Sequence, residues 1–397
     1  MAFQRDIVSV LAERVAEPNM MLMQVVVGPR QTGKSTAIAQ MLETCSFPSH
    51  SVSADDVLTP NEEWLSTEWQ QARNMVQKHG DAVVLVVDEI QKVPQWANVV
   101  KGLWDADRRN GLALKVVLSG SSALLVRKGL EDSLAGRFEL LHSTHWSWKE
   151  CEEAFGYSFD DYLFFGGYPG AAPFVADEKR WRSYMREAII EPTISKDVLE
   201  GEVVRKPALL RALFELGAQF SAQELSYNKI LGQLTEAGNT TTLAHYLDLL
   251  DKAGMLRGLQ KYSDKALMSR KSSPRFLAYD TSLMVASTGY TKEVFRGDSA
   301  RWGHVVESAV GAYLLAQSKK EGFSVHWWRQ GVYEVDFVLS DSQNLAAIEV
   351  KSGRTKSQGG MAKFLEKYPH ARRIVVGGAA AGAVDLQSFL AGEVPLF

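Results

Sequence analysis

Residues 1–150 alternate short, largely apolar runs with amphipathic stretches. The runs at residues 21–27, 83–87 and 114–118 have the length of a strand and consist mostly of Val, Leu and Met. Apolar runs of this kind are typical of parallel strands that helices cover on both faces. The pattern therefore predicts an α/β domain built on a parallel sheet, with a further helix and strand within residues 127–144.

A glycine-rich loop joins the first predicted strand to an amphipathic helix. Its sequence, GPRQTGKS at residues 28–35, fits Gly-x-x-x-x-Gly-Lys-Ser/Thr, a pattern in which main-chain N–H groups surround phosphate oxygens. The helix N-terminus adds partial positive charge, Lys34 would reach the outer phosphates, and Ser35 would ligate Mg²⁺. The other expected contacts to ATP are Gly28, Pro29, Arg30, Gln31, Thr32, Gly33 and Thr36. Because a strand precedes the loop and a helix follows it, we interpret it as an ATP site.

Polar residues follow the second and third apolar runs, at the sheet edge where the glycine-rich loop should also lie. Asp88 and Glu89 follow the second run, and this pair predicts a Mg²⁺ ligand and a base that polarises water, respectively. Ser119 and Ser121 follow the third run, where a hydroxyl could sense the γ-phosphate. For each serine taken singly, a turn that leaves a buried strand explains the sequence equally well.

A glycine-rich break interrupts the helical patterns of residues 151–200. It contains Gly166, Gly167, Pro169 and Gly170. Since glycine and proline interrupt regular structure, we interpret the break as a hinge between the ATP-binding core and a helical lid.

Residues 201–270 show three helical patterns, separated by turns and followed by a short strand. We expect the third helix to start at Thr240–Thr242, which could cap it, and to end before Gly254. This is a winged-helix pattern, and such modules often place a helix in the DNA major groove. Many of them bind only protein, however, and few basic residues lie on this helix.

The last part of the chain predicts a helix followed by the two strands of a hairpin. The helix lies within residues 301–322, and the strands are expected at residues 325–340 and 345–353. Glu307 lies on the helix and Asp336 on the first of these strands.

The residues of this hairpin fit the pattern of a metal-dependent nuclease site. Asp336, Glu349 and the carbonyl of Val350 would converge on Mg²⁺, and Lys351 would orient or deprotonate the attacking water. Glu307 would join the metal site from the helix. Alternating strands also place charged residues on exposed faces, and such a fold can bind DNA without cleaving it. Cleavage therefore stays open.

Basic and aromatic residues near the predicted nuclease site could contact DNA. The basic ones are Lys351, Arg354, Lys356, His370, Arg372 and Arg373. Trp327 and Trp328 could stack on bases, although at least one of them is expected in the core.

Length, net charge, cysteine count and apolar runs limit the number of domains, the mode of DNA contact and the cellular setting that we expect. A chain of 397 residues exceeds what one hydrophobic core usually serves, so we expect more than one domain. The net charge of −3 means that DNA contacts would need local basic patches. The two cysteines, Cys45 and Cys151, lack the spacing of metal ligands and favour a reduced cytoplasm. No run approaches the roughly 20 apolar residues of a membrane helix, so no membrane partner is expected.

The chain resembles prokaryotic AAA+ ATPases with a restriction-endonuclease-like, PD-(D/E)xK C-terminal domain. The resemblance rests on the motifs described above and on two further stretches, YLFFGGYPGA (162–171) and REAIIEPTISKDVL (186–199). The resemblance spans nearly the whole chain. It implies an oligomer, such as a hexamer, in which Arg137 enters a neighbouring subunit's ATP site; an arginine that balances a helix dipole is the alternative. The stretch HSTHWSWKE (142–150) departs from the family pattern at the junction with the lid.

We therefore predict an AAA+ ATPase core at residues 1–150, a helical lid at 151–200, a winged-helix region at 201–270 and a nuclease-like domain at 271–397. The expected function is ATP hydrolysis coupled to binding and remodelling of DNA, with branched DNA as one candidate. Two alternatives remain, an ATP-gated Mg²⁺-dependent nuclease of a defence type and a signalling or scaffold ATPase that binds proteins.

Overall fold

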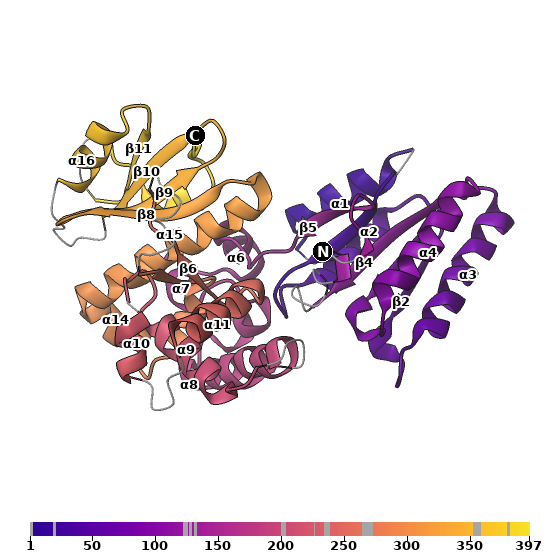
Figure 1. Cartoon of the computed structure of the whole chain (residues 1–397), viewed down its shortest axis with the longest axis horizontal. Helices are drawn as coiled ribbons and strands as arrows, with labels where there is room; N and C mark the ends of the chain where they lie inside the picture. Colours follow the sequence, from indigo (N-terminus) through magenta and orange to yellow (C-terminus); the bar gives the residue numbers. More distant parts are fainter. Residues whose placement is uncertain are drawn as a thin grey trace. The chain divides into compact units, whose positions relative to one another are not determined.

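The computed structural model describes residues 3–18, 21–121, 126, 129–130, 133–199, 204–225, 227–233, 239–263, 273–351, 359–378 and 382–397. The chain forms two compact units, Met1–Thr144 and His145–Phe397 (Figure 1). The first unit ends six residues before the expected boundary at residue 150, and the whole remainder forms one unit.

The first unit is built on a five-stranded sheet in which every pair of neighbouring strands is parallel. The strand order is β2-β3-β4-β1-β5. The strands are β1 (Met23–Val27), β2 (Ser49–Ser53), β3 (Val83–Asp88), β4 (Leu114–Gly120) and β5 (Phe138–His142). The three apolar runs form the central strands β1, β3 and β4, which confirms the predicted parallel sheet. Strand β2, with the sequence SHSVS, was not predicted because it is a polar edge strand.

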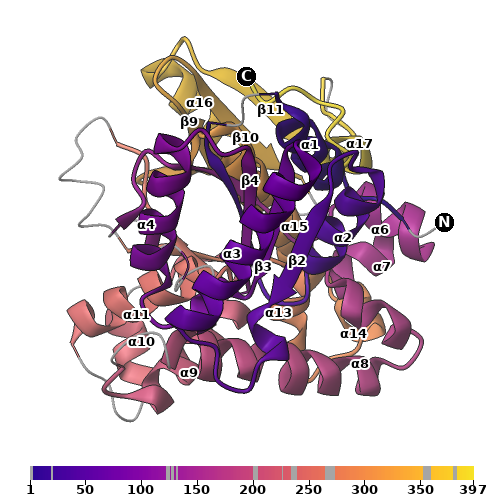
Figure 2. The same cartoon turned by 90° about the vertical axis from the view of Figure 1, so that its right-hand side faces the viewer.

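Helices cover both faces of this sheet. They are α1 (Asp6–Ala16), α2 (Lys34–Thr44), α3 (Glu62–His79) and α4 (Trp96–Arg109), with short 3₁₀ turns η1 (Ala54–Asp56) and η2 (Ile90–Lys92). Val25 of β1 packs in one apolar cluster with residues of α3 and α4, and Val26 packs in the other with residues of α1 and α2. In Figure 2, α4 lies on the left of this unit and α1 and α2 lie on the right. Buried strands with apolar residues on both faces require this arrangement.

The second unit begins with helices. These are α6 (Trp148–Phe155), α7 (Phe159–Phe165), η3 (Pro169–Phe174), α8 (Glu178–Tyr184), the π-helical turns η4 (Met185–Ile190) and η5 (Thr193–Leu199), α9 (Pro207–Gln219), α10 (Tyr227–Gln233) and α11 (Thr240–Lys252). Two antiparallel strands follow, β6 (Leu256–Leu259) and β7 (Arg275–Ala278), and then α13 (Thr281–Ala286), α14 (Lys292–Gly297) and α15 (Ser299–Glu321).

The three helices and the strand expected in residues 201–270 are present, as α9, α10, α11 and β6. The expected boundary at residue 270 falls between β6 and β7, which hydrogen-bond to each other, so it does not separate two domains. The cap of α11 also differs from the expectation. The side chain of Asn239, and not Thr240–Thr242, accepts the hydrogen bond from Thr242 N.

The second unit ends in a four-stranded sheet of order β11-β10-β9-β8. Its strands are β8 (Ser324–Gln330), β9 (Tyr333–Ser340), β10 (Leu345–Val350) and β11 (Arg372–Val376); α16 (Gly360–Lys367) precedes β11, and α17 (Leu386–Leu390) follows it. The pairs β8–β9 and β9–β10 are antiparallel, whereas β10–β11 is parallel. Residues 325–340, expected as one strand, form two, because Gly331, with a φ of 60°, turns the chain between them.

The glycine pair at the expected hinge is closely packed within the second unit. Gly166 has a φ of 70°, and a Cβ there would lie 1.8 Å from Asp280 Oδ1. A Cβ on Gly167 would lie 2.1 Å from the main-chain oxygen of Trp146, and Gly167 N donates to Asp280 Oδ2 at 2.8 Å. Burial raises the pKa of Asp280. These glycines permit close contact between segments of the second unit, and the expected hinge stays a prediction.

Candidate functional site

The glycine-rich loop lies between β1 and α2 and folds around the Lys34 side chain. Gly33, with a φ of 85°, precedes the helix in the left-handed conformation that glycine tolerates best. The buried Lys34 ammonium donates to the carbonyls of Gly28 at 3.0 Å and Pro29 at 2.7 Å. Thr32 is also buried, and its hydroxyl donates to the Pro29 carbonyl at 3.0 Å. The loop conformation is therefore fixed by its own side chains.

Asp88 is contacted by hydroxyls from two neighbouring elements. The Ser35 hydroxyl, in the first turn of α2, donates to Asp88 Oδ2 at 2.7 Å, and the Ser119 hydroxyl of β4 donates to Asp88 Oδ1. Magnesium prefers hard oxygen ligands, and one carboxylate with one hydroxyl beside a phosphate loop is a common protein contribution. Ser35 and Asp88 therefore fit the Mg²⁺ site expected of them.

Glu89 is held by a separate set of contacts. Its carboxylate accepts hydrogen bonds from the Ser121 hydroxyl at 2.7 Å and from the Gln91 side-chain amide. Its backbone lies in the left-handed region, with a φ of 52°, which is uncommon for a residue with a side chain. The two serines thus differ in partner, since Ser119 contacts Asp88. The sequence did not predict the contact of Gln91 with Glu89, because the position of Gln91 follows no recognisable motif.

Arg137 does not join these residues within one chain. It immediately precedes β5, at the amino edge of the parallel sheet, whereas Asp88 ends β3 at the carboxyl edge. Its guanidinium forms two hydrogen bonds with Asp105 of α4, at 2.8 and 2.9 Å. This hydrogen bonding lowers the pKa of Asp105. Within the chain, Arg137 has a structural ion pair, and contact with a second subunit remains a prediction.

Arg5 is a buried residue of the nucleotide loop region that the sequence did not reveal. It precedes α1, and its guanidinium donates to Thr32 O at 3.0 Å, to Ser143 Oγ at 3.1 Å and to Thr144 O at 3.1 Å. A Cβ on Gly28 would lie 2.0 Å from Ser143 O, so the loop also packs directly on this segment. Arg5 therefore ties the glycine-rich loop to the last residues of the first unit.

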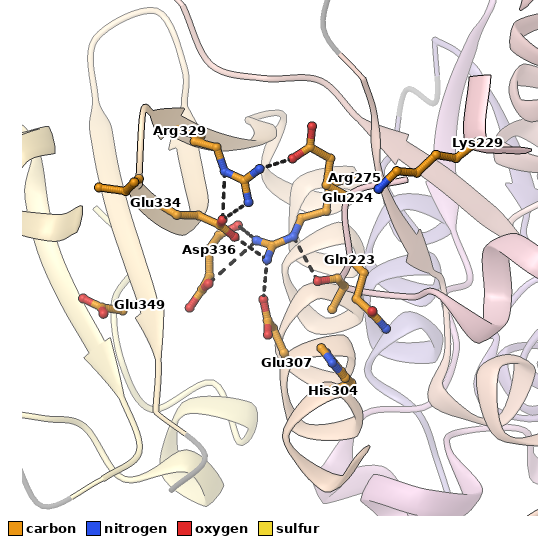
Figure 3. Close-up of a pocket in the computed structure, with 12 residues that line it drawn as sticks. Gln223, Glu224, Lys229, Arg275, His304, Glu307, Arg329, Glu334, Asp336 and Glu349 are labelled. Atoms are coloured by element: carbon orange, nitrogen blue, oxygen red, sulfur yellow. Dashed lines mark hydrogen bonds and ion pairs between the residues drawn. The ribbon is translucent and has the colours of Figure 1, made fainter. Parts of the chain in front are cut away.

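The second unit contains a charged pocket of about 700 Å³ (Figure 3). Three predicted metal ligands line it, namely Glu307 of α15, Asp336 of β9 and Glu349 of β10. The other charged residues of the lining are Glu224, Lys229, Arg275, Arg329 and Glu334. The fold thus brings the predicted acidic residues to one pocket, together with several basic ones.

The acidic residues of this pocket are paired with cationic or N–H groups. Figure 3 shows Glu307 and Asp336 directed toward Arg275, with ion-pair distances of 2.9 and 3.7 Å, respectively. Glu349 pairs with Lys351. Among the residues that the structure describes, no three His, Cys, Asp or Glu side chains are placed to hold a metal ion. The carboxylates that the sequence assigned to a metal ion are thus engaged in ion pairs with Arg275 and Lys351.

Of the remaining residues predicted to contact DNA, some are buried and some are exposed. Trp327 and Trp328 are buried, so they belong to the core and are not placed to stack on bases. Arg372 and Arg373 are exposed on β11, and Arg354 and Lys356 lie outside the described residues.

The parallel sheet, the glycine-rich loop and the Asp88 cluster define the first unit as a P-loop nucleotide-binding domain. Residues 22–152 match the family model described as AAA domain, which assigns this unit to the AAA type. Residues 302–388 match a domain of unknown function, DUF4143, and residues 156–294 match another, DUF8612. The chain thus combines an AAA domain with a C-terminal DUF4143 domain.

The chain is similar to two uncharacterized relatives and to one solved structure. An uncharacterized protein of Haemophilus influenzae is 22% identical over 347 residues, covering 82% of each chain. One of Mycobacterium tuberculosis is 25% identical over 336 residues, covering 83% of this chain and 70% of its own. The Walker-type ATPase of Pyrococcus abyssi has a similar fold, with a TM-score of 0.53 and 13% identity over 72% of this chain and 96% of its own. No helix in the described ranges is long and apolar enough to cross a membrane.

Proposed function

We propose that the first unit hydrolyses ATP. The observation that carries this proposal is the placement of Asp88 and Glu89. Asp88 receives hydroxyl hydrogen bonds from Ser35 and Ser119, while Glu89 is held separately by Ser121. A metal-ligand carboxylate and a neighbouring base, each with its own hydrogen-bond support, are what hydrolysis of a phosphoanhydride requires.

Each residue of the site has a separate role in hydrolysis. Lys34 and the loop amides would bind the β- and γ-phosphates, and Ser35 and Asp88 would hold Mg²⁺, which would neutralise charge on the phosphate oxygens. Glu89 accepts a proton from the attacking water, in the orientation that Ser121 and Gln91 maintain. Ser119 lies close enough to Asp88 to respond to changes at the metal ligand.

We further propose that the second unit engages DNA and that ATP hydrolysis changes this engagement. Two features support the idea. Helices α9–α11 followed by the β6–β7 pair have the order of a winged helix, and the order α15-β8-β9-β10-α16-β11 agrees with a nuclease-like platform. Exposed Arg372 and Arg373 supply positive charge for phosphate contacts.

The ATPase part is tested by steady-state hydrolysis and nucleotide binding. Lys34→Ala should abolish ATP binding, and Glu89→Gln should bind ATP with the wild-type Kd but hydrolyse it at least 100-fold more slowly. Lys92→Ala, on an exposed residue, and Glu139→Gln, on a partly buried residue of β5, are matched controls in the same unit and should behave as wild type. Wild-type turnover by Glu89→Gln would refute the assignment of the base.

The DNA part is tested by gel shifts on linear duplex, single-stranded and branched DNA, together with ATPase assays at each DNA concentration. Binding or stimulation that falls with rising salt would support engagement of the phosphate backbone. ATP hydrolysis with neither binding nor stimulation would reject the DNA proposal, leave the ATPase proposal intact, and favour a protein partner.

A further inference from the structure

We propose that Arg275 is the built-in cation of the pocket in the second unit, and that this pocket excludes divalent metal ions. The first residue of β7 thus supplies the charge that a metal-dependent nuclease would obtain from Mg²⁺. Occupation of these carboxylates by Arg275 is independent of the proposed ATPase and DNA-binding functions.

Arg275 is buried, and its guanidinium is surrounded by oxygen atoms. Nε donates to Ala222 O at 3.0 Å, and Nη1 donates to Asp336 O at 2.9 Å. Nη2 lies 2.9 Å from Glu307 Oε1 and donates to Glu334 Oε1 at 2.7 Å. A guanidinium has five N–H groups in a fixed planar fork. With Asp336 Oδ1 at 3.7 Å, five oxygens surround this fork, so the side chain is positioned from several sides.

The charge of Arg275 is stable in this environment. Burial by itself would lower its pKa, but the carboxylates of Glu307, Asp336 and Glu334 more than compensate, and the net effect raises the pKa above its ordinary value. A buried cation surrounded by carboxylates is strongly favoured over an isolated one. A divalent ion bound to Glu307 and Asp336 would lie within a few ångströms of this permanent positive charge, which opposes its binding.

The contacts of the predicted metal ligands also oppose metal binding. Asp336 Oδ2 accepts a hydrogen bond from Val350 N at 2.8 Å, and its other oxygen faces Arg275. The ammonium of Lys351, expected to act on water, pairs with Glu349. The main-chain group of Val350 that approaches Asp336 is therefore a donor, whereas the predicted metal site needed the carbonyl of that residue as a ligand.

Arg275 cannot leave the pocket without disturbing the surrounding structure. It joins the turn at Ala222, helix α15 through Glu307 and strand β9 through Asp336. These segments lie in the three-helix region and in the helix and sheet that follow it. Because one side chain contacts all of them, its movement would leave buried carboxylates and carbonyls without their hydrogen-bond donor. Arg275 is thus a structural cation and not a mobile gate.

The rest of the pocket does not attract phosphate either. Its lining contains five carboxylates (Glu224, Glu307, Glu334, Asp336 and Glu349) and three basic residues (Lys229, Arg275 and Arg329), a formal difference of −2. Lys351, which pairs with Glu349, reduces the negative excess to −1, so without a metal ion the pocket offers a DNA backbone no net positive charge. If Arg275 excludes the metal ion, the pocket has neither a bound metal ion nor net positive charge to promote phosphodiester cleavage.

The first experiment measures Mn²⁺ binding to the nucleotide-free full-length protein by electron paramagnetic resonance. We expect no Mn²⁺ site that depends on Glu349, so the isotherms of wild type and Glu349→Gln should coincide. Asp88→Asn identifies any ion held by the first unit. A Mn²⁺ ion that is bound by wild type, retained by Asp88→Asn and lost by Glu349→Gln would overturn the proposal, and this result requires no variant of Arg275.

The second experiment removes the internal cation. Arg275→Met should create a divalent-ion site that wild type lacks, with an affinity for Mn²⁺ at least tenfold above any binding that wild type shows in this pocket and a Tm that rises on adding Mn²⁺. Arg329→Met is the matched control, since this more exposed arginine pairs with Glu224 and Glu334 in the same pocket and leaves Arg275 in place. A folded Arg275→Met protein without increased Mn²⁺ affinity would refute the role assigned to Arg275. If this variant does not fold, the comparison of Mn²⁺ binding by wild type and Glu349→Gln decides whether the pocket excludes metal ions.

Discussion

Replacing Arg5 with Met tests whether the segment before α1 supports the nucleotide loop. Met keeps an unbranched apolar side chain in the buried site but removes the hydrogen bonds to Thr32 O, Ser143 Oγ and Thr144 O. Each hydrogen bond from a charged donor contributes about 1.5–3 kcal/mol, and buried acceptors that lose their donor destabilise the fold further. Since contributions within one network are not additive, we expect a total loss of about 3 kcal/mol.

This loss should be visible in the unfolding of the first unit. For a domain of this size, about 3 kcal/mol corresponds to a decrease in Tm of roughly 10 °C. Because Thr32 lies in the glycine-rich loop, the KM for ATP should rise while kcat, which depends on Glu89, changes little. Arg5→Lys should restore part of the effect, since one ammonium can reach only some of the acceptors.

The measurements are differential scanning calorimetry and steady-state ATPase kinetics. Arg14→Met, on helix α1, is the matched control, because Arg14 is more exposed and contacts Gln24 and Glu139 instead of the loop. We expect the control to lie within about 1 kcal/mol of wild type. An Arg5→Met protein with wild-type Tm and KM would show that the three hydrogen bonds do not support the loop.

Three further predictions follow from single contacts. Arg137→Ala should lose ATPase activity if this arginine acts in a neighbouring subunit, whereas Asp105→Asn, which weakens the same ion pair, should keep it; equal loss in both variants would favour a structural role. Gly167→Ala should destabilise the second unit by about 2 kcal/mol through overpacking, while Gly232→Ala, with open space around its Cβ, should not, as thermal unfolding would show. Ser121→Ala should lower kcat about tenfold at constant KM, the loss expected for one hydrogen bond to a charged base; an unchanged kcat would contradict its role.

The sequence was most informative about the first unit. Val83–Val87 and the other apolar runs could be assigned to central strands because both of their faces are buried and no alternation is needed. The glycine-rich loop could be assigned because its chemistry depends on local backbone geometry, which the sequence specifies directly. The edge strand at Ser49–Ser53 carries too few apolar residues to be recognised.

The partners of individual side chains were less predictable. Nothing in the spacing of Ser119 and Ser121 indicated which carboxylate each would contact, since that depends on the twist and stagger of neighbouring strands. Arg5 and Arg275 were missed for a similar reason. Each meets acceptors far away in the chain, and a single arginine carries no periodic signal.

The acidic set of the second unit shows where motif reasoning fails. The spacing of Glu349 and Lys351 and the position of Asp336 were interpreted correctly as one neighbourhood, since all of these residues lie at one end of the β9–β10 pair. A motif names the residues that converge but not the other groups that reach the same place. Arg275 lies 61 residues before Asp336, and only the folded chain brings it there.

The packing of Gly28 against Ser143 also bears on how the protein is made. The glycine-rich loop is synthesised more than a hundred residues before the segment that packs on it. Strand β5 pairs with β1 and is among the last parts of the first unit to be synthesised. The nucleotide site of a nascent chain therefore stays unfinished until residues 138–144 have left the exit tunnel. Since domains generally fold as units during synthesis, ATP should bind only once the first unit is complete, while the second is still being translated.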